Sequence, residues 1–254
     1  MSKIELPKSV ENAVNNLSDE PTRHLGHVVT SVIDICFGGI NYYAERLDIA
    51  RKRKLDKWIV KTENKLKQIP EERFQDAPLE IAGPLTEASK FYFENEQLSE
   101  MFTNLLVSSC DKSTLSKVHP CFVELIKQMS SIDAELLMIF KYEDQAPIVN
   151  YKVVVSEKQD YNYIKRFVFL VNNSFDDVDL SATSLINLER LGLLEIKMSE
   201  YFNNDSYYEK FNYYPLYKDY NLVPDSTGFP KKEIEKGIVR ITPFGRSFLE
   251  VRVK

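Results

Sequence analysis

One histidine with acidic residues nearby in the sequence comes closest to an acid–base site in this chain. His119 could act as a general base if a carboxylate of Asp111, Glu124 or Asp133 oriented its ring. His119 stands directly before Pro120, however, and this position favours a packing or capping role at the start of a helix. We therefore predict a structural role for His119 and no catalytic residue.

Metal-binding chemistry has little support in the sequence. His24 and His27 are close enough to share one face of a helix, but no third ligand stands at a matching offset. The cysteines Cys36, Cys110 and Cys121 are odd in number and widely spaced, which favours reduced thiols in the cytoplasm over a disulfide framework or a zinc site. A glycine-rich phosphate loop and a nucleophile elbow are also missing. We predict a non-enzymatic protein with no cofactor and no metal.

Residues 201–220 are unusually aromatic, with nine aromatic side chains of which seven are tyrosines. Tyrosine offers a large contact area and a polar tip at low entropic cost, so it is enriched in binding surfaces. Two interpretations stay open: a recognition segment for a partner protein, or an oversized wing whose rings pack back on the helical part. The candidate partner-binding residues are Tyr201, Tyr207, Tyr208, Tyr213, Tyr214, Tyr217 and Tyr220.

The charge pattern disfavours nucleic acid and membrane as partners. The net charge is −5, with 33 Lys and Arg against 38 Asp and Glu, so the excess of basic residues that phosphate contacts require is missing. The basic run at residues 51–57 could bind an anionic membrane, but acidic residues accompany it and favour a solvated helix face. The longest apolar stretch, residues 28–43, is too short and interrupted to span a bilayer.

Apolar periodicity predicts helices through the first part of the chain. Amphipathic patterns cover residues 25–43 and 44–68, and further helices follow near residues 84–93 and 95–109. Two more begin at Pro120, which suits the first turn of a helix, and at Ser130, which forms a capping-box-like pair with Asp133. We predict an α-helical domain over residues 1–145, with these helices forming a bundle.

After residue 146 the pattern changes to strands and helices. Alternating β-branched residues predict a strand at 148–155, and a helix at 181–191 ends at Gly192. Strands at 193–198 and 237–241 and a helix after Thr242 complete a winged-helix-like domain, residues 146–254, which includes the aromatic excursion at 201–220. The candidate recognition helix offers Asn187 and Arg190 for DNA, but acidic residues precede it and favour protein contact or structural support.

Several segments, in order, resemble the abortive infection alpha family of bacterial phage-defence proteins. The segments are residues 79–84, 101–109, 110–140, 185–194 and 241–245. The resemblance implies a role in phage defence and carries over no catalytic residue. The family-motif residues for which we expect structural roles are His119, Pro120, Asp133, Asn187, Gly192, Pro243 and Gly245.

The sequence thus predicts an α+β protein with an N-terminal α-helical bundle and a winged-helix-like C-terminal domain. The resemblance implies phage defence, and the missing catalytic constellations favour protein–protein contact with a phage or host partner, as sensor, adaptor or toxin. Two alternatives stay open: a winged-helix DNA-binding regulator, and a membrane-active effector that uses the helices at residues 25–57. The sequence assigns neither the partner nor the oligomeric state.

Overall fold

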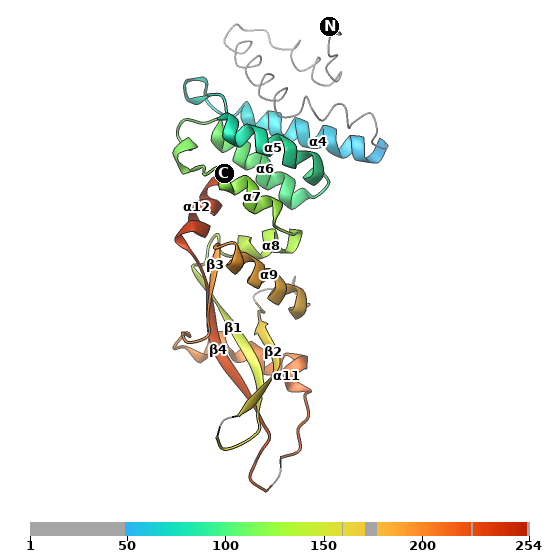
Figure 1. The fold of residues 1–254 in the computed structure, drawn as a ribbon, viewed down its shortest axis with the longest axis vertical. Coiled ribbons are helices and arrows are strands. Elements are labelled where there is room, and N and C mark those ends of the chain that lie inside the picture. The colour runs from blue at the N-terminus through green and yellow to red at the C-terminus, as the bar shows by residue number, and fades with distance from the viewer. Residues whose placement is uncertain (1–48, 159, 171–176, 225, 253–254) are drawn as a thin grey trace. The chain divides into compact units, whose positions relative to one another are not determined.

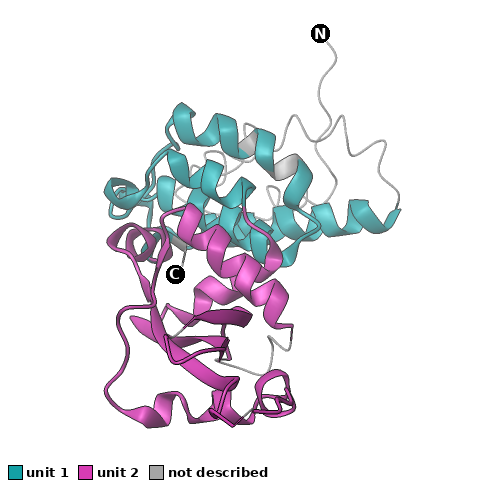
Figure 2. Ribbon diagram, turned by 60° about the horizontal axis from the view of Figure 1, so that its bottom comes forward, with its two compact units in different colours: residues 1–128, 250–254 teal, residues 129–249 magenta. Residues whose placement is uncertain are grey.

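The computed structural model describes residues 49–158, 160–170, 177–224 and 226–252 (Figure 1). The chain divides into two compact units, residues 1–128 with 250–254 (unit 1) and residues 129–249 (unit 2), which Figure 2 draws in teal and magenta. These units differ from the predicted domain ranges, which stay a prediction. The helix expected at residues 25–43, the start of the next one, and His24, His27 and Cys36 lie outside the described residues.

The regular elements described in unit 1 are helical apart from one isolated bridge between Phe74 and Asp111. In chain order they are α4 (Ile49–Leu66), η2 (Glu71–Arg73), α5 (Leu79–Tyr92), α6 (Glu96–Ser109), η3 (Leu115–Lys117) and α7 (Cys121–Lys127). The unit also contains the end of α12 (Pro243–Arg252). The grouping of these helices as a bundle stays a prediction.

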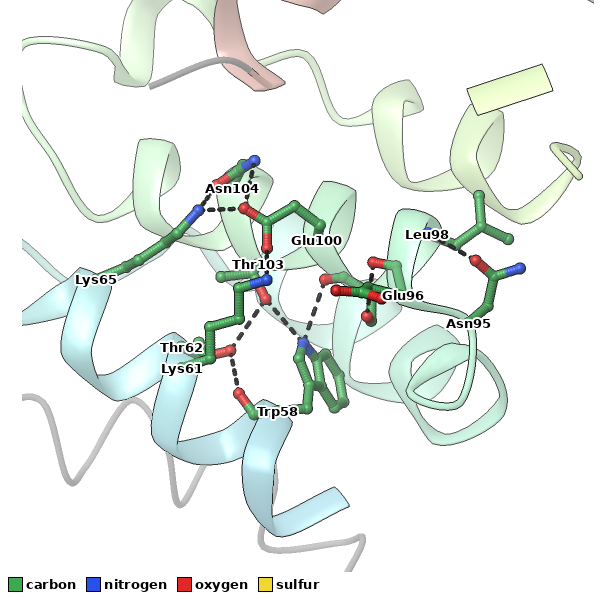
Figure 3. Close-up of polar contacts among 11 residues, drawn as sticks. Trp58, Lys61, Thr62, Lys65, Asn95, Glu96, Leu98, Glu100, Thr103 and Asn104 are labelled. Carbon is green, nitrogen blue, oxygen red and sulfur yellow. Dashed lines mark hydrogen bonds and ion pairs between the residues drawn. The ribbon is translucent and has the colours of Figure 1, made fainter. Parts of the chain in front are cut away.

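Helix α4 packs on α6 through buried hydrogen bonds that are surrounded by apolar side chains. The indole Nε1 of Trp58 donates to Thr103 Oγ1 at 2.8 Å and to the carbonyl of Ser99 at 3.2 Å (Figure 3). The hydroxyl of Thr62 lies 3.0 Å from that of Thr103. Leu55 and Phe102 are fully buried in the same unit. These buried polar groups therefore find their hydrogen-bond partners inside the protein, as burial requires.

Helix α5 begins earlier than the sequence predicts. Its first residue is Leu79, Pro78 is its N-cap, and Pro84 lies inside the helix instead of starting it. The apolar face explains the difference, because Ile81 and Leu85 are both buried and lie four residues apart. The sequence predicts a start near residue 84, whereas the apolar stripe continues about one turn further back.

An ion pair in unit 1 joins the segment after α4 to the segment after α6. Arg73 Nε donates to Asp111 Oδ1 at 3.1 Å, and its Nη2 donates to Asp111 Oδ2. Two backbone hydrogen bonds flank the pair, from Gln75 N to the carbonyl of Cys110 and from Lys112 N to the carbonyl of Arg73, each 2.9 Å long. The hydrogen bond from Arg73, although opposed by burial, lowers the pKa of Asp111 from 3.8 to about 2.

This lowered pKa predicts a pH-dependent cost for replacing Asp111 with asparagine. A carboxylate with a lowered pKa stabilises the fold above about pH 4 and loses that contribution as the pH falls towards 2. The Asp111→Asn variant should therefore have a lower free energy of unfolding than the wild type at pH 7, and the difference should shrink below pH 4. Urea titrations at pH 7 and pH 2.5 measure it, with Glu157→Gln, at an exposed position in unit 2, as the control. An equal difference at both pH values would contradict this account.

Unit 2 is built on an antiparallel sheet of four strands in the order β2-β1-β4-β3. The strands are β1 (Gln145–Val154), β2 (Tyr161–Val168), β3 (Leu194–Lys197) and β4 (Lys231–Ile241). The helices are α8 (Ser131–Ile139), α9 (Val178–Arg190), η4 (Asp205–Tyr207), α10 (Glu209–Tyr213) and α11 (Pro215–Lys218), and α12 begins in this unit. The mixed α and β composition agrees with the predicted class.

The order of helix, strand, excursion, strand and helix in unit 2 follows the prediction, with differences at the boundaries. Strand β3 pairs with β4 as expected, with Leu194 opposite Ile241. Helix α9 begins at Val178, three residues before the predicted start, and the side chain of Asp177 caps it. Strands β1 and β2 extend the same sheet. The assignment to the winged-helix fold stays a prediction.

Candidate interaction surface

The aromatic excursion lies against one face of the sheet in unit 2 (Figure 1). Val149 and Tyr151 of β1 form a buried core with Tyr208 and Phe211 of the excursion. Phe202, Tyr214 and Tyr217 are partly buried and pack against the same core. The rings that turn inward therefore cover the sheet, whereas the alternative drawn from sequence placed them on the helical part of the chain.

Hydroxyl groups at the edge of this core hold the excursion in place. The hydroxyl of Tyr208 donates to the carbonyl of Gly237 at 2.9 Å and accepts from the backbone N–H of Phe202 at 3.1 Å. The hydroxyl of Tyr151 donates to the carbonyl of Phe211 at 2.8 Å. Burial raises the pKa of both tyrosines, so their hydroxyls stay protonated donors at neutral pH. The segment is thus tied to β1 and β4.

The other tyrosines of the excursion face solvent. The exposed fractions are 59% for Tyr201, 49% for Tyr207, 73% for Tyr213 and 41% for Tyr220. The seven candidate residues therefore separate into inward-facing anchors and outward-facing side chains. We call the four outward-facing residues Tyr201, Tyr207, Tyr213 and Tyr220 the exposed tyrosine surface.

Local contacts hold the part of the excursion that carries Tyr207. The ring of Tyr207 stacks on Phe202 with 4.5 Å between centroids. The side chain of Asn204 caps the start of η4 by accepting from the backbone N–H of Ser206 at 3.0 Å. Lys236 of β4 forms an ion pair with Asp205 at 2.7 Å. Tyr207 is therefore exposed while its surroundings are fixed.

The opposite face of the sheet carries two exposed tyrosines that the sequence analysis did not select. Tyr161 and Tyr163 of β2 are 46% and 39% exposed, and their rings meet edge to face at 5.2 Å. Their hydrogen bond is the main cause that raises the pKa of Tyr163 to about 12. The alternation of Tyr161 and Tyr163 along the chain is the signal that could have indicated an outward-facing strand.

Asp133, one of the family-motif residues, accepts hydrogen bonds that hold two helices together. It forms a capping box with Ser130, whose side chain accepts from Asp133 N at 3.1 Å while Asp133 Oδ2 accepts from Ser130 N at 2.6 Å. The same carboxylate accepts from Ser184 Oγ and, at 3.0 Å, from Asn187 Nδ2, both in α9. Asp133 is only 3% exposed. It joins α8 to α9.

The two residues that could have read DNA bases also have partners within unit 2. The amide of Asn187 donates to Asp133, and its Oδ1 accepts from Arg190 Nε at 3.1 Å and Nη2 at 2.8 Å. A bidentate contact with a base edge would need these same groups. Asn187 is therefore engaged in the contact of α9 with α8, and Arg190 in a contact within α9.

The remaining motif residues in unit 2 connect the end of α9 to the start of α12. Gly192 has a φ of +73°, a conformation that glycine adopts without strain. Thr242 Oγ1 donates to the carbonyl of Gly192 at 2.6 Å and accepts from Gly245 N at 2.9 Å. The residue after this threonine, Pro243, is the first of α12. Gly245 packs against the carbonyl of Leu193.

His119 lies at the start of α7, where its contacts are those of a helix cap. The residue is exposed, and its Nδ1 accepts from the backbone N–H of Cys121 at 3.2 Å, one residue beyond Pro120. Two of the carboxylates considered as its partners are engaged elsewhere, since Asp111 pairs with Arg73 and Glu124 with Lys127. The third, Asp133, is held by the residues of α8 and α9 described above.

Two further observations concern the described residues only. Within them, histidine, cysteine and acidic side chains do not gather in any group of three placed to hold a metal ion. In the same part of the chain every helix is too short or too polar to cross a membrane.

Comparison with known proteins identifies the family. No curated protein and no solved structure matches the chain. A family model described as abortive infection alpha matches residues 50–251, which is most of the sequence and includes each of the motif segments described above. The chain therefore belongs to the abortive infection alpha family.

Proposed function

We propose that this protein takes part in phage defence without catalysing a reaction, by contacting a protein partner through the exposed tyrosine surface. The family supports the defence role, because abortive infection is a defence against phage. The protein-contact role is supported by one observation above all: four tyrosines of one segment are exposed while Tyr208 anchors that segment to the sheet. The partner would be a phage or host protein met in the cytoplasm.

Anchoring matters for the affinity of such a surface. Binding usually costs free energy because loops and side chains become ordered, and a segment that is already fixed avoids part of this cost. Tyrosine has few rotatable bonds and is over-represented among residues that dominate binding energy. The hydrogen bonds of Tyr151 and Tyr208 and the ion pair of Lys236 with Asp205 hold the segment that carries these tyrosines.

Two acidic residues close to the surface are paired with basic residues of β4, which favours a contact dominated by aromatic area. Glu200 pairs with Arg240 at 3.2 Å, and Asp205 pairs with Lys236. These pairs produce neither a positive nor a negative field, so they do not support electrostatic steering of a charged polymer towards the surface. A folded or extended protein segment with apolar and polar groups fits this surface better than a nucleic acid does.

A phage challenge tests the proposal. Replacement of the four exposed tyrosines by serine should raise the plating efficiency of phage to that on cells without the gene, because the contact area is lost. Replacement of the same four residues by phenylalanine should keep most of the protection, since it preserves the rings. The protein should remain folded in both variants, because these side chains are outside the core.

A matched control uses exposed apolar residues of unit 2 outside the excursion. Tyr142 and Leu180 are 81% and 50% exposed, and their replacement by serine should leave protection intact. Full protection by the four-serine variant, at the same cellular abundance as the wild type, would show that the exposed tyrosine surface is not the working contact.

A further inference from the structure

A cavity in unit 1, apart from the exposed tyrosine surface, has the features of a small-molecule site. Its volume is about 270 Å³, and it is bordered by α4, η2, α6 and the last turn of α12. Ligand pockets usually measure about 300–1,000 Å³, so only a small ligand would fit. Apolar side chains of Ile69, Val107 and Val251 line part of it, and Lys65, Gln68 and Arg73 supply polar groups.

The α4 side of this cavity contributes an ammonium group, that of Lys65. Lys65 Nζ pairs with Glu100 and lies 2.6 Å from Asn104 Oδ1, while Lys61 Nζ lies 2.5 Å from the second carboxylate oxygen of Glu100 (Figure 3). Burial opposes ionisation of Glu100, but the hydrogen bonds from Lys61 and Lys65 outweigh it and lower its pKa. Two ammonium groups therefore share one carboxylate, and of these three residues Lys65 lines the cavity.

The η2 side of the cavity contributes a guanidinium with unused donors. Arg73 forms its ion pair with Asp111 through Nε and Nη2, and Nη2 also donates to Ser113 Oγ at 2.9 Å. Within the described residues, Nη1 of Arg73 and the side-chain amide of Gln68 make no hydrogen bond. Guanidinium, ammonium and amide donors are the groups that proteins use to hold carboxylates and phosphates.

We propose that this cavity binds a small organic anion, with its carboxylate or phosphate group at Lys65 and Arg73 and its apolar body against Ile69, Val107 and Val251. Two cations, Lys65 and Arg73, and one carboxylate, that of Asp111, line the cavity, and its guanidinium, ammonium and amide donors suit an anion. The apolar part of the lining favours an anion with a hydrocarbon body over a bare inorganic ion.

Calorimetric titration of the full-length protein tests this site with four probes. Sodium hexanoate and monobutyl phosphate combine an anionic group with a short apolar body, whereas 1-hexanol lacks the charge and inorganic phosphate lacks the body. Hexanoate, butyl phosphate or both should bind at least tenfold more tightly than 1-hexanol and inorganic phosphate. The comparison of the first two also shows whether the site prefers carboxylate or phosphate. Failure of both organic anions to bind the wild type would overturn the proposal.

Variants at the cavity locate the binding. Gln68→Glu places a negative charge at an exposed position without removing a hydrogen bond, and it should weaken binding about tenfold by repulsion. Gln145→Glu makes the same change at an exposed position in unit 2 and should leave binding unchanged. Val107→Phe should fill the cavity and prevent binding. Binding that is equally strong in the wild type, Gln68→Glu and Val107→Phe proteins would place the anion elsewhere and contradict the assignment.

Discussion

Replacing Gly245 by alanine is expected to destabilise unit 2 by about 3 kcal/mol or more. A Cβ at this position would lie 2.1 Å from the carbonyl oxygen of Leu193 and 3.0 Å from Cγ1 of Ile241. The carbonyl of Leu193 cannot move away freely, because it accepts hydrogen bonds from Thr242 N at 3.0 Å and Thr242 Oγ1 at 3.2 Å. The start of α12 or the end of β4 would have to shift, and urea denaturation would show the loss.

A second glycine provides a control, because its replacement by alanine should change the free energy of unfolding in the opposite direction. Gly83 lies within α5, and a Cβ added there meets no atom within 4 Å. Alanine is a better helix former than glycine, so Gly83→Ala should raise the free energy of unfolding by up to about 1 kcal/mol. Equal stability of the Gly245→Ala and Gly83→Ala proteins would contradict the tight packing of the start of α12 against Leu193.

Replacing Asp133 by alanine should also cost about 3 kcal/mol or more, for a different reason. The carboxylate accepts from Ser130 N, Ser184 Oγ and Asn187 Nδ2, and its loss would remove all three hydrogen bonds. The hydroxyl of Ser184 is buried, and a buried donor that loses its acceptor costs about 1–3 kcal/mol, to which the loss of the capping box adds. Urea denaturation followed by circular dichroism measures the change.

The matched control for Asp133→Ala replaces an acidic residue that takes no part in a hydrogen-bond network of this kind. Glu143 is exposed in the turn after α8, and Glu143→Ala should change the free energy of unfolding by less than about 0.5 kcal/mol. Equal stability of the Asp133→Ala and Glu143→Ala proteins would mean that Asp133 does not hold α8 and α9 together, and a role other than structural would then have to be considered for it.

The elements that the sequence predicts best are those whose signals are local. The capping box of Ser130 and Asp133 is confirmed, because both groups lie within one turn. Gly192 has the positive φ that its predicted place at the end of a helix implies. The strand expected at residues 148–155 is present as β1, since its β-branched residues favour a strand, although nearly all of its residues are buried and burial does not alternate along it.

Elements that depend on distant partners are predicted less well. Strand β2, Tyr161–Val168, has no clear signal of its own, because its outward side chains are polar or aromatic and it is ordered by pairing with β1. Phe167 adopts a φ of +56°, and its backbone N–H donates to Asn150 Oδ1 at 2.8 Å. No pattern within residues 161–168 could have predicted that contact.

The same difference between local signals and distant contacts applies to the exposed tyrosine surface. The number and spacing of tyrosines at residues 201–220 indicate a binding segment, but the side chains are identical in type. Only the folded structure separates Tyr208, at 2% exposed, from Tyr213, at 73%. The anchoring hydrogen bonds come from Tyr151 and Gly237, which are far away in sequence. The sequence therefore locates the segment, and the packing selects the residues that can meet a partner.

The most direct test of the protein-contact claim is photo-crosslinking in phage-challenged cells. A benzophenone amino acid replaces Tyr213 of the exposed tyrosine surface in one protein and Tyr142, outside it, in another; both positions are highly exposed. We expect a covalent adduct with a discrete protein from position 213 but not from position 142, and its loss when Tyr201, Tyr207 and Tyr220 are serine. Equal adducts from both positions, or none from position 213 in cells that are protected from phage, would contradict the account.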